Sequence, residues 1–402
     1  MSIIVQKYGG TSMANSDCVK NVAEKVVRSK RGGHDVVVVV SAPAGMTDHL
    51  VNRAKEITDK PSGRELDMIL ATGEQISISL LAMAIKALGE EAISFTSAQV
   101  GIFTDENHNK AKIETIDTTK IIKALTEGKV VIIAGFQGVT KDLEITTLGR
   151  GGSDTSAVAI GVALKADEVE IYTDVDGIYT SDPRVVPNAH KIHRITFDEM
   201  LEMAGSGAKV LHLRSVELAA KNHMPIHLRS SFNDEMGTYV MDEEENMEQA
   251  LVRGVAHTTN NAKITIANIE NKPQNIATIF KTISDANVNV DVITQNVVDQ
   301  NRITISFTVA EEEYDRALRL SNNLGKQLHA EAVYGTEDVA KVCIIGVGMK
   351  TTPGVASRLF QCLADQGVHI EMVSTSDINI TCVVSKADYA KAVLAIHQEF
   401  EL

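Results

Sequence analysis

Five continuously apolar runs alternate with helical patterns through the first 230 residues of the chain. The runs lie at 2–6, 35–42, 129–135, 168–174 and 224–230. The helical patterns lie near 16–30, 64–88, 117–127, 153–165 and 207–222. Strands that are apolar at successive positions are typical of parallel sheets covered on both faces. The alternation therefore predicts an open, mostly parallel α/β sheet, in which ligands gather beyond the carboxyl ends of the strands.

The last third of the chain repeats itself. At a constant offset of 80 residues, the segment from Pro273, PQNIATIFKTISDANVNVDVITQN, aligns without gaps on the segment from Pro353, PGVASRLFQCLADQGVHIEMVSTS. Each copy has the order strand, helix, strand, strand, helix, which is the ferredoxin-like α+β pattern. Two copies are too few for a solenoid, so we expect a tandem pair of small domains. A single domain with chance similarity is the alternative, and the many matched apolar positions count against it.

The amino-acid composition changes abruptly between the predicted α/β part of the chain and the repeated segments that follow it. The stretch 230–250, SSFNDEMGTYVMDEEENMEQA, contains seven acidic residues and no basic one, and is interpreted as a connector. A chain of 402 residues is also too long for one hydrophobic core. We therefore predict an α/β domain over 1–232, an acidic linker over 233–250, and α+β domains over 251–335 and 336–402.

Charge and cysteine content narrow the class of protein. The formal net charge of −14 disfavours binding to nucleic acid and anionic membranes, because both depend on clustered Lys and Arg. The four cysteines are scattered without a C-x-x-C motif, which favours reduced thiols. The chain shows no signal-peptide pattern and no uninterrupted apolar run of about 18 residues, so we expect a cytoplasmic protein. The histidine pair in HKIH (190–193) lacks a third ligand, and no metal-binding residues are predicted.

The first predicted strand runs into KYGGTS, residues 7–12. Gly9 and Gly10 allow backbone amides to approach an anion, Ser12 offers a hydroxyl, and Lys7 supplies a positive charge at the strand end. This combination suits a phosphate group, and a tight turn with a solvent-facing lysine is the alternative. The chain has no G-x-x-x-x-G-K-[ST] motif and no H-R-D motif, which excludes P-loop NTPases and protein kinases at the level of motifs.

The segment TTLGRGGSDTSA, residues 146–157, offers a second anion site. Ser153 or Asp154 is expected to cap the helix that follows, with Arg150 and the glycine amides at its positive end. A carboxylate such as Asp154 beside bound phosphates is repulsive unless a cation lies between them. The pocket is therefore expected to hold Mg²⁺ or an amino group. An ordinary capped helix with a surface arginine is the alternative.

Polar residues also follow other strands of the predicted sheet. The aspartates of YTDVDGIYTSDPR, residues 172–184, suit a ribose and a nucleobase, and a plain cluster of turns is the alternative. Ser41, Thr47 and Glu74 are embedded in apolar sequence at the same edge. A glutamate within an apolar helical stretch is rarely without a partner, so Glu74 is expected to face a positively charged ligand group.

These motifs, followed by AGSGAKVLHLRSVE at 204–217, stand in the same order as in aspartate kinases of the amino-acid-kinase superfamily, which the chain resembles over essentially all 402 residues. The repeated modules resemble paired ACT regulatory domains. The resemblance implies an amino-acid-kinase fold and the phosphorylation of L-aspartate by MgATP to 4-phospho-L-aspartate. This reaction is the first step in the biosynthesis of lysine, threonine, methionine and diaminopimelate. The length indicates the monofunctional type, without a fused homoserine dehydrogenase.

The resemblance also implies a role for each matching residue. Lys7 and Asp154 are the expected catalytic residues. Glu74 is expected to bind the ammonium of aspartate and Arg150 its carboxylate, in a pocket completed by Thr47, Gly151, Gly152, Ser153 and Asp154. ATP is expected to contact Lys7, Tyr8, Gly9, Gly10, Ser12, Ser41, Thr173, Asp174, Tyr179, Asp182, Arg184 and Lys209.

The chemistry of an aspartate acceptor agrees with this assignment. Its side-chain carboxyl, with a pKa of about 3.9, is almost fully ionised at neutral pH and attacks without a general base. A different acceptor on the same fold, such as N-acetylglutamate, glutamate or a nucleoside monophosphate, is disfavoured because Glu74 and Arg150 suit a free amino acid. A catalytically silent amino-acid sensor is disfavoured because the chain retains Lys7 and Asp154.

By the same resemblance, the tandem modules bind a feedback amino acid. The expected residues are Asn289, Asp291 and Gln295 in one copy and His369, Ile370 and Ser376 in the other. Related enzymes have K-P-G-E where this chain has NKPQN, so lysine, threonine or both stay open as effectors. We expect a homodimer, or a heterotetramer with a regulatory subunit that starts internally at Met247.

Overall fold

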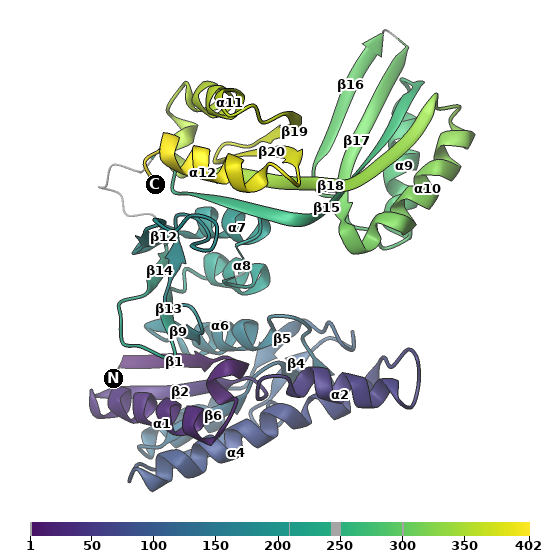
Figure 1. Cartoon of the computed structure of the whole chain (residues 1–402). Helices are drawn as coiled ribbons and strands as arrows, with labels where there is room; N and C mark the ends of the chain where they lie inside the picture. The colour runs from purple at the N-terminus through teal and green to yellow at the C-terminus, as the bar shows by residue number, and fades with distance from the viewer. Residues whose placement is uncertain (1, 209, 243–250, 300) are drawn as a thin grey trace. The chain divides into compact units, whose positions relative to one another are not determined.

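The computed structural model describes residues 2–208, 210–242, 251–299 and 301–402 (Figure 1). Within these residues the chain forms two compact units. The first comprises the described residues of 1–178, 191–204 and 209–246, and the second those of 179–190, 205–208 and 247–402. Lys209 and Met247, both singled out in the sequence, lie outside the described residues.

A sheet of eight strands forms the centre of the first unit, in the order β12-β14-β13-β9-β1-β2-β6-β3. All neighbouring pairs except β13–β14 are parallel, which confirms the predicted open, mostly parallel sheet. The strands are β1 (Ser2–Tyr8), β2 (His34–Val40), β3 (Ala92–Phe95), β6 (Val130–Ala134), β9 (Glu168–Thr173), β12 (Arg194–Thr196), β13 (Ile226–Ser230) and β14 (Thr238–Met241).

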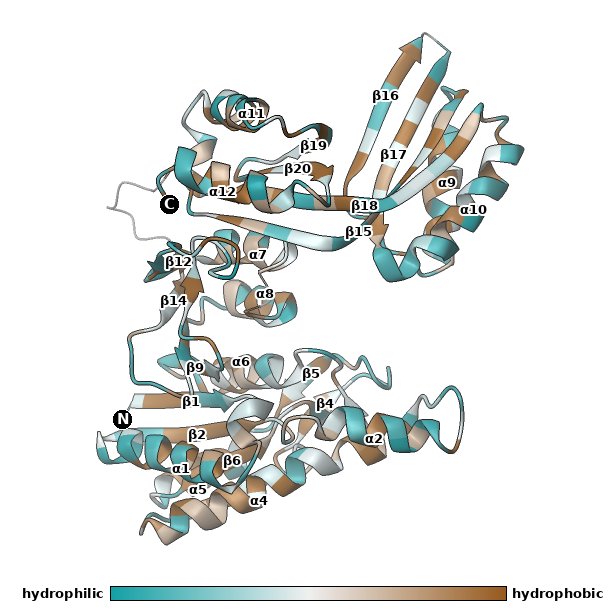
Figure 2. Cartoon of the chain, viewed as in Figure 1, coloured by the Kyte–Doolittle hydropathy of each residue, from teal (hydrophilic) through white to brown (hydrophobic). Residues whose placement is uncertain are grey.

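Helices cover both faces of this sheet. On one face α1 (Ser16–Arg31) and α4 (Thr72–Ala87) share a hydrophobic core with Val36, Val38 and Val40. On the other face α6 (Gly152–Leu164) contacts β1, β2 and β9. A Cβ on Gly161 would lie 2.6 Å from Val169, so only glycine allows α6 to approach this closely. Burial on both faces explains the apolar runs at residues 3–5 of β1 and 36–40 of β2 (Figure 2).

The remaining elements of the first unit are short. A second sheet has the order β5-β4-β7-β8, built from β4 (Ile102–Thr104), β5 (Ile113–Ile116), β7 (Gln137–Val139) and β8 (Ile145–Thr147). The other helices are η1 (Gly10–Met13), α2 (Met46–Lys55), α3 (Arg64–Leu70), α5 (Thr119–Thr126), α7 (Phe197–Gly205) and α8 (Leu213–Lys221). Two-residue strands β10 (Ile178–Tyr179) and β11 (Lys191–Ile192) pair with each other before the ACT-like repeats begin.

Three expectations from the sequence need correction. The helix predicted over 64–88 is divided at Ala71 into α3 and α4, and of the helix predicted over 207–222 the structure describes only α8. The linker predicted over 233–250 was wrong in part, because its residues Thr238–Met241 form β14. This strand pairs antiparallel with β13, so the sheet extends past the predicted boundary at 232.

One stretch, Arg64–Ala87, is long and apolar enough to cross a membrane by length and composition alone. Of its most apolar window, 44% is buried inside the protein, and core helices of soluble proteins pass the same test. Ile78, Leu81 and Ile85 of α4 lie in the core beneath the sheet. Burial against the sheet accounts for these three residues, whereas Met68, Ile76, Leu80 and Met83 of the same stretch are exposed.

The second unit is built on a sheet of six strands in the order β16-β17-β15-β18-β20-β19, with every neighbouring pair antiparallel. The strands are β15 (Gly254–Glu270), β16 (Ile293–Asp299), β17 (Arg302–Ala310), β18 (Ala332–Ile345), β19 (Ile370–Thr375) and β20 (Asn379–Ser385). The helices are η2 (Glu311–Glu313), α9 (Pro273–Asp285), α10 (Tyr314–Gln327), η3 (Val347–Lys350), α11 (Val355–Asp365) and α12 (Tyr389–Glu399). Both copies of the repeat thus have the predicted order of strands and helices.

The two copies share their central strands instead of following one another as separate domains. One hydrophobic core contains residues from Ala262 to Val333. The other contains Val252 and Val255 together with residues from Ala340 to Ile396. The start of β15 therefore packs with the second copy, and the predicted boundaries of 251–335 and 336–402 miss this exchange. Figure 2 shows apolar and polar residues alternating along β17, as expected for a strand with one covered face.

Candidate active site

The two predicted catalytic residues, Lys7 and Asp154, meet in the first unit. Lys7 is the next-to-last residue of β1, and Asp154 lies in the first turn of α6. Lys7 Nζ lies 2.6 Å from Asp154 Oδ1, and each side chain is only 11% exposed. A carboxylate in the first turn is favoured by the helix dipole, and its lysine partner places a cation at the same point. The ion pair therefore brings the ends of β1 and α6 to one site.

The loops after β1 and β2 are tied together by their backbones. Gly9 N donates to Tyr172 O at 3.2 Å, and Ala44 N donates to Gly10 O at 3.0 Å. A Cβ on Gly10 would lie 3.0 Å from Ala42 O, which accounts for glycine at this position. The strand-end loops that carry Lys7, Gly9, Gly10 and Ser41 thus lie side by side, as expected at the carboxyl edge of a parallel sheet.

Two residues predicted to bind ATP are enclosed by protein. The Tyr8 side chain is fully buried, and its ring stacks on Tyr172 with the ring centres 4.6 Å apart. Ser12 is 1% exposed, and its hydroxyl lies 2.5 Å from that of Ser231. The Tyr8 ring therefore belongs to the core, and the Ser12 hydroxyl already has a partner.

Glu74 lies in the first turn of α4 and is 2% exposed. Its Oε1 accepts a hydrogen bond of 3.0 Å from Ala42 N, beside Ser41 at the end of β2. Burial raises the pKa of Glu74 to about 7, although hydrogen bonds from the Ala42 amide and the Gln137 side chain lower it in part. A cationic ligand group at this carboxyl would favour its ionised form.

The loop before α6 presents Arg150. Arg150 is exposed and forms no ion pair within the described residues. Gly149 and Gly151 on either side have φ angles of 79° and 70°, which glycine adopts without strain. A Cβ on Gly151 would lie 2.0 Å from His212, so no other residue fits there. The glycines therefore fix the course of the loop and leave the guanidinium accessible.

The predicted cap of α6 was wrong. The helix begins at Gly152, and its N-cap is Gly151, which has no side chain to cap it. Ser153 and Asp154 lie inside the first turn and are buried. Without a capping side chain, the first amides of α6 stay available to an anion.

The other predicted residues of the substrate pockets are spread more widely. Thr47 is exposed in the first turn of α2. Thr173 ends β9, and its hydroxyl donates to Asp174 Oδ1 at 3.0 Å. Tyr179, Asp182 and Arg184 belong to the second unit, where Arg184 Nη2 lies 2.7 Å from Asp182 Oδ2. The hydrogen bond from Arg184 lowers the pKa of Asp182. Thr173 and Asp174 lie at the end of β9, the strand that pairs with β1, which carries Lys7.

The predicted effector residues lie in the second unit on exposed segments. The Asp291 carboxylate forms an ion pair with Lys341, and Asn289 N donates to Glu313 Oε2 at 3.3 Å. Gln295 lies on the edge strand β16 and is exposed. In the other copy Ile370 begins β19, the exposed His369 precedes it, and Ser376 follows the strand. Asp291 is therefore already paired, and an effector ammonium would compete with Lys341.

Asp67, which no sequence motif singled out, anchors the Arg150 loop. Asp67, on α3, is completely buried and accepts hydrogen bonds from the Thr147 hydroxyl, His108 Nδ1 and the Asn109 amide groups. Arg214 holds the same loop through Leu148 O at 2.9 Å. The signal was present: like Glu74, Asp67 is an acidic residue within an apolar helical stretch.

We expect Asp67→Ala to lower the free energy of unfolding by about 3 kcal/mol, because it leaves several buried donors without a partner. Asp67→Asn retains one acceptor oxygen and is expected to lose less. Urea unfolding, with exposed Asp59→Ala as the control, measures both effects. A loss for Asp67→Ala no larger than that of the control would show that the cluster contributes nothing to stability.

Comparison with known proteins agrees with this geometry. Residues 2–230 match the model of the amino acid kinase family, and 264–322 and 342–400 match that of an ACT domain. The aspartate kinase of Pseudomonas putida is 48% identical over 100% of this chain and 98% of its own. Aspartokinase 2 of Bacillus subtilis is 47% identical, also over 100% of this chain and 98% of its own.

Solved structures agree as well. Escherichia coli aspartokinase III in complex with aspartate and ADP has a TM-score of 0.81 at 28% identity and covers 100% of both chains. The same enzyme in complex with lysine and aspartate has a TM-score of 0.79 at 28% identity over 99% of both chains. The Lys7–Asp154 site, the tandem ACT modules and these full-length matches together place the chain in the aspartate kinase family.

Proposed function

We propose that the chain phosphorylates the side-chain carboxylate of L-aspartate with ATP, giving 4-phospho-L-aspartate. The observation that carries this proposal is the buried ion pair of Lys7 and Asp154 at the positive end of α6, beside an accessible Arg150. The site combines a lysine and open amides for polyphosphate with an arginine for a carboxylate. The structure of E. coli aspartokinase III in complex with aspartate and ADP supports the same pair of ligands.

Catalysis at such a site rests on positioning and charge. The acceptor carboxylate is ionised at neutral pH, so no side chain has to remove a proton from it. Arg150 binds the α-carboxylate of aspartate and Glu74 its ammonium, which directs the side chain toward the γ-phosphate. Lys7 faces the charge that spreads over the transferring phosphoryl group, and Asp154 holds the lysine in place.

The carboxylates at the strand ends fit a magnesium ion. Mg²⁺ prefers oxygen ligands and is usually held by one or two carboxylates together with substrate phosphates. Asp174, exposed at the end of β9, and Asp154 would supply those oxygens. Bound there, the ion would neutralise charge on the phosphates of ATP. The proposed contacts of the nucleotide also include Lys209, Tyr179, Asp182 and Arg184. We expect the reaction to take place in the cytoplasm.

The ACT modules are proposed to bind a feedback amino acid. Lysine is the first candidate, because it accompanies aspartate in one of the E. coli aspartokinase III structures. The predicted residues Asn289, Asp291 and Gln295, and His369, Ile370 and Ser376 in the second copy, remain the proposed contacts. A homodimer or a heterotetramer with a subunit that starts at Met247 also remains a proposal.

A hydroxamate assay tests the activity. Purified full-length protein with MgATP, L-aspartate and hydroxylamine is expected to form aspartyl hydroxamate, and less of it when lysine, threonine or both are added. Glutamate and N-acetylglutamate serve as alternative acceptors. Product from either of these but not from aspartate would overturn the proposed substrate, and full activity in every combination of effectors would overturn the proposed regulation.

We expect Glu74→Gln to stabilise the ligand-free protein at alkaline pH. Folded Glu74 stays protonated up to a pKa of about 7, whereas the unfolded chain ionises it from its ordinary value of 4.5. The stability contributed by the neutral carboxyl is therefore fully present below pH 4.5 and is lost as the pH rises through 7, by about 3 kcal/mol in all. The glutamine variant does not ionise and keeps that stability.

Urea unfolding of both proteins between about pH 5 and about pH 8.5 measures this difference. Glu56→Gln, at an exposed position after α2, is the control. Aspartate is expected to stabilise the wild type more than Glu74→Gln, because its ammonium favours the ionised carboxylate. A stability difference that does not change with pH would show that Glu74 titrates normally.

A further inference from the structure

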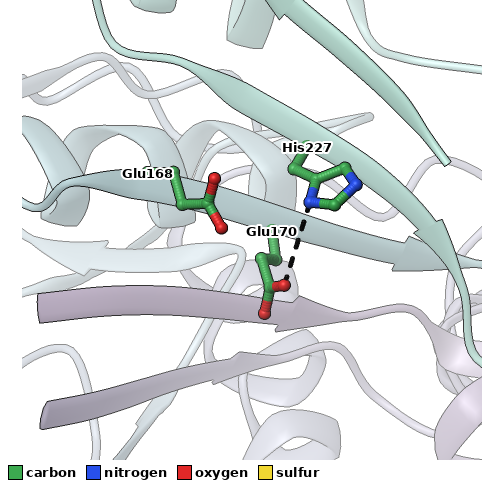
Figure 3. Close-up of side chains that lie close together, drawn as sticks. All are labelled: Glu168, Glu170 and His227. Carbon is green, nitrogen blue, oxygen red and sulfur yellow. Dashed lines mark ion pairs between the residues drawn. The ribbon is translucent and has the colours of Figure 1, made fainter. Parts of the chain in front are cut away.

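Three metal-binding side chains converge toward the amino ends of β9 and β13, away from the strand ends that carry Lys7. Glu168 and Glu170 lie two residues apart on β9 and share one face of the strand, and His227 on β13 lies directly opposite Glu170 in register (Figure 3). Their ligand atoms all lie within 4.8 Å of one another. His227 Nδ1 lies 3.9 Å from Glu170 Oε1. Neighbouring strands of a rigid sheet thus hold the three groups together.

His227 is the least satisfied member of the cluster. It is 6% exposed, and neither of its ring nitrogens has a hydrogen-bond partner within the described residues. The ring stacks on Tyr239 with the ring centres 3.8 Å apart, so it cannot turn freely toward solvent. Buried polar groups normally have partners. Figure 3 shows the imidazole on the side of the two carboxylates.

The charges around His227 favour a cation. Arg229 Nη1 and Gln6 Nε2 donate to Glu170 at 2.8 and 2.7 Å. Arg229 offsets one carboxylate charge of the two, which leaves the cluster with a net negative charge.

We propose that Glu168, Glu170 and His227 form a binding site for a divalent transition-metal ion of the Zn²⁺ class, separate from the catalytic site. One imidazole nitrogen and two carboxylate oxygens suit Zn²⁺, Co²⁺ or Ni²⁺, whereas Mg²⁺ prefers oxygen alone. Tetrahedral Zn²⁺ with bonds of about 2.1 Å holds its ligands about 3.4 Å apart. Glu168 is only partly buried, and a change of its side-chain rotamer would have to close the remaining distance.

The bound ion would cross-link β9 to β13 and stabilise the first unit. Because it would lie away from the carboxyl ends of the strands, it would not be needed for phosphoryl transfer. Glu170 also accepts a hydrogen bond from the Tyr172 hydroxyl at 3.3 Å, so it would coordinate through the lone pairs that Arg229, Gln6 and Tyr172 leave free. The Arg229 charge so close to the ion limits the affinity, and removing this arginine should raise it.

Full-length protein stripped with EDTA is titrated with Zn²⁺ by calorimetry and with Co²⁺ by absorption spectroscopy. The wild-type protein is expected to bind one metal ion more tightly than any further ions. Binding of this first ion is expected to raise the Tm. Glu168→Gln and His227→Gln are each expected to weaken that binding about tenfold or more and to lose the rise in Tm. Glu168→Gln keeps the proposal testable if the buried His227 substitution does not fold.

His223→Gln is the matched control, because His223 is exposed and pairs with Asp242 outside the cluster. It is expected to bind Zn²⁺ and Co²⁺ like the wild type. Equal affinity and an equal Co²⁺ spectrum in Glu168→Gln and the wild type would overturn the proposal, as would the absence of any binding event that the Glu168 or His227 substitutions remove. His227 would then be a neutral core histidine that stacks on Tyr239.

Discussion

Replacing Lys7 by alanine is expected to lower kcat about 1000-fold, while the KM for aspartate stays close to that of the wild type. One unit charge at about 4 Å, at an effective dielectric constant of about 20, contributes about 4 kcal/mol. That free energy corresponds to a factor of about 1000 in rate if it acts on the transition state. Because Lys7 is proposed to face the phosphates and not the aspartate, the loss should appear in kcat.

The partner of Lys7 provides the internal control. Lys7→Ala leaves Asp154, whose side chain is only 11% exposed, without its cation and close to the phosphates. Part of the rate loss then comes from the Asp154 carboxylate, whose charge Lys7 no longer offsets, so the double variant Lys7→Ala with Asp154→Asn should lose less than the two single losses combined. Steady-state kinetics of the three variants, with thermal unfolding to verify folding, measure the coupling. Turnover of Lys7→Ala near the wild-type level would remove Lys7 from the mechanism.

The sequence was sufficient to predict the central sheet of the first unit because its strands are buried on both faces. Runs such as 35–42 are apolar at almost every position, and regular helices between such runs are typical of a parallel sheet covered on both sides. The strand ends then placed Lys7, Arg150 and Asp154 at one edge. The same logic could not find β4, β7 or β8, each three residues long, because so few positions carry no periodicity.

Other features depend on contacts between residues far apart in the chain. The packing of the start of β15 with the second ACT module could not be predicted from the repeat. A constant offset between two copies carries no information on which strands pair with each other. The sequence also did not predict that glycine is the N-cap of α6. Serine and aspartate are preferred N-cap residues, so Ser153 and Asp154 were expected there. The close approach of His212 to Gly151 decides that point, and it arises only in the folded chain.

Arg150 should control the affinity for aspartate more than the rate of transfer. A guanidinium binds a carboxylate through two parallel hydrogen bonds, and truncating one partner of such a pair costs about 2–4 kcal/mol. Arg150→Ala is therefore expected to lower kcat/KM for aspartate by a factor of about 30 to about 1000, mainly through KM. Arg150→Lys keeps the positive charge but cannot donate two parallel hydrogen bonds to one carboxylate. Its kcat/KM for aspartate should therefore lie between those of the alanine variant and the wild type.

The KM for ATP distinguishes this role from a general loss of structure. Arg150 is exposed and unpaired within the described residues, so its removal should change neither Tm nor the KM for ATP. Arg53→Ala, at an exposed position on α2, is the matched control for loss of one surface charge. Gly151→Ala should reproduce the aspartate defect with Arg150 still present, because a Cβ there collides with His212 and displaces the loop. If KM rose equally for ATP and aspartate in Arg150→Ala, the arginine would belong to the nucleotide site, and the acceptor pocket would have to be sought elsewhere along the sheet edge.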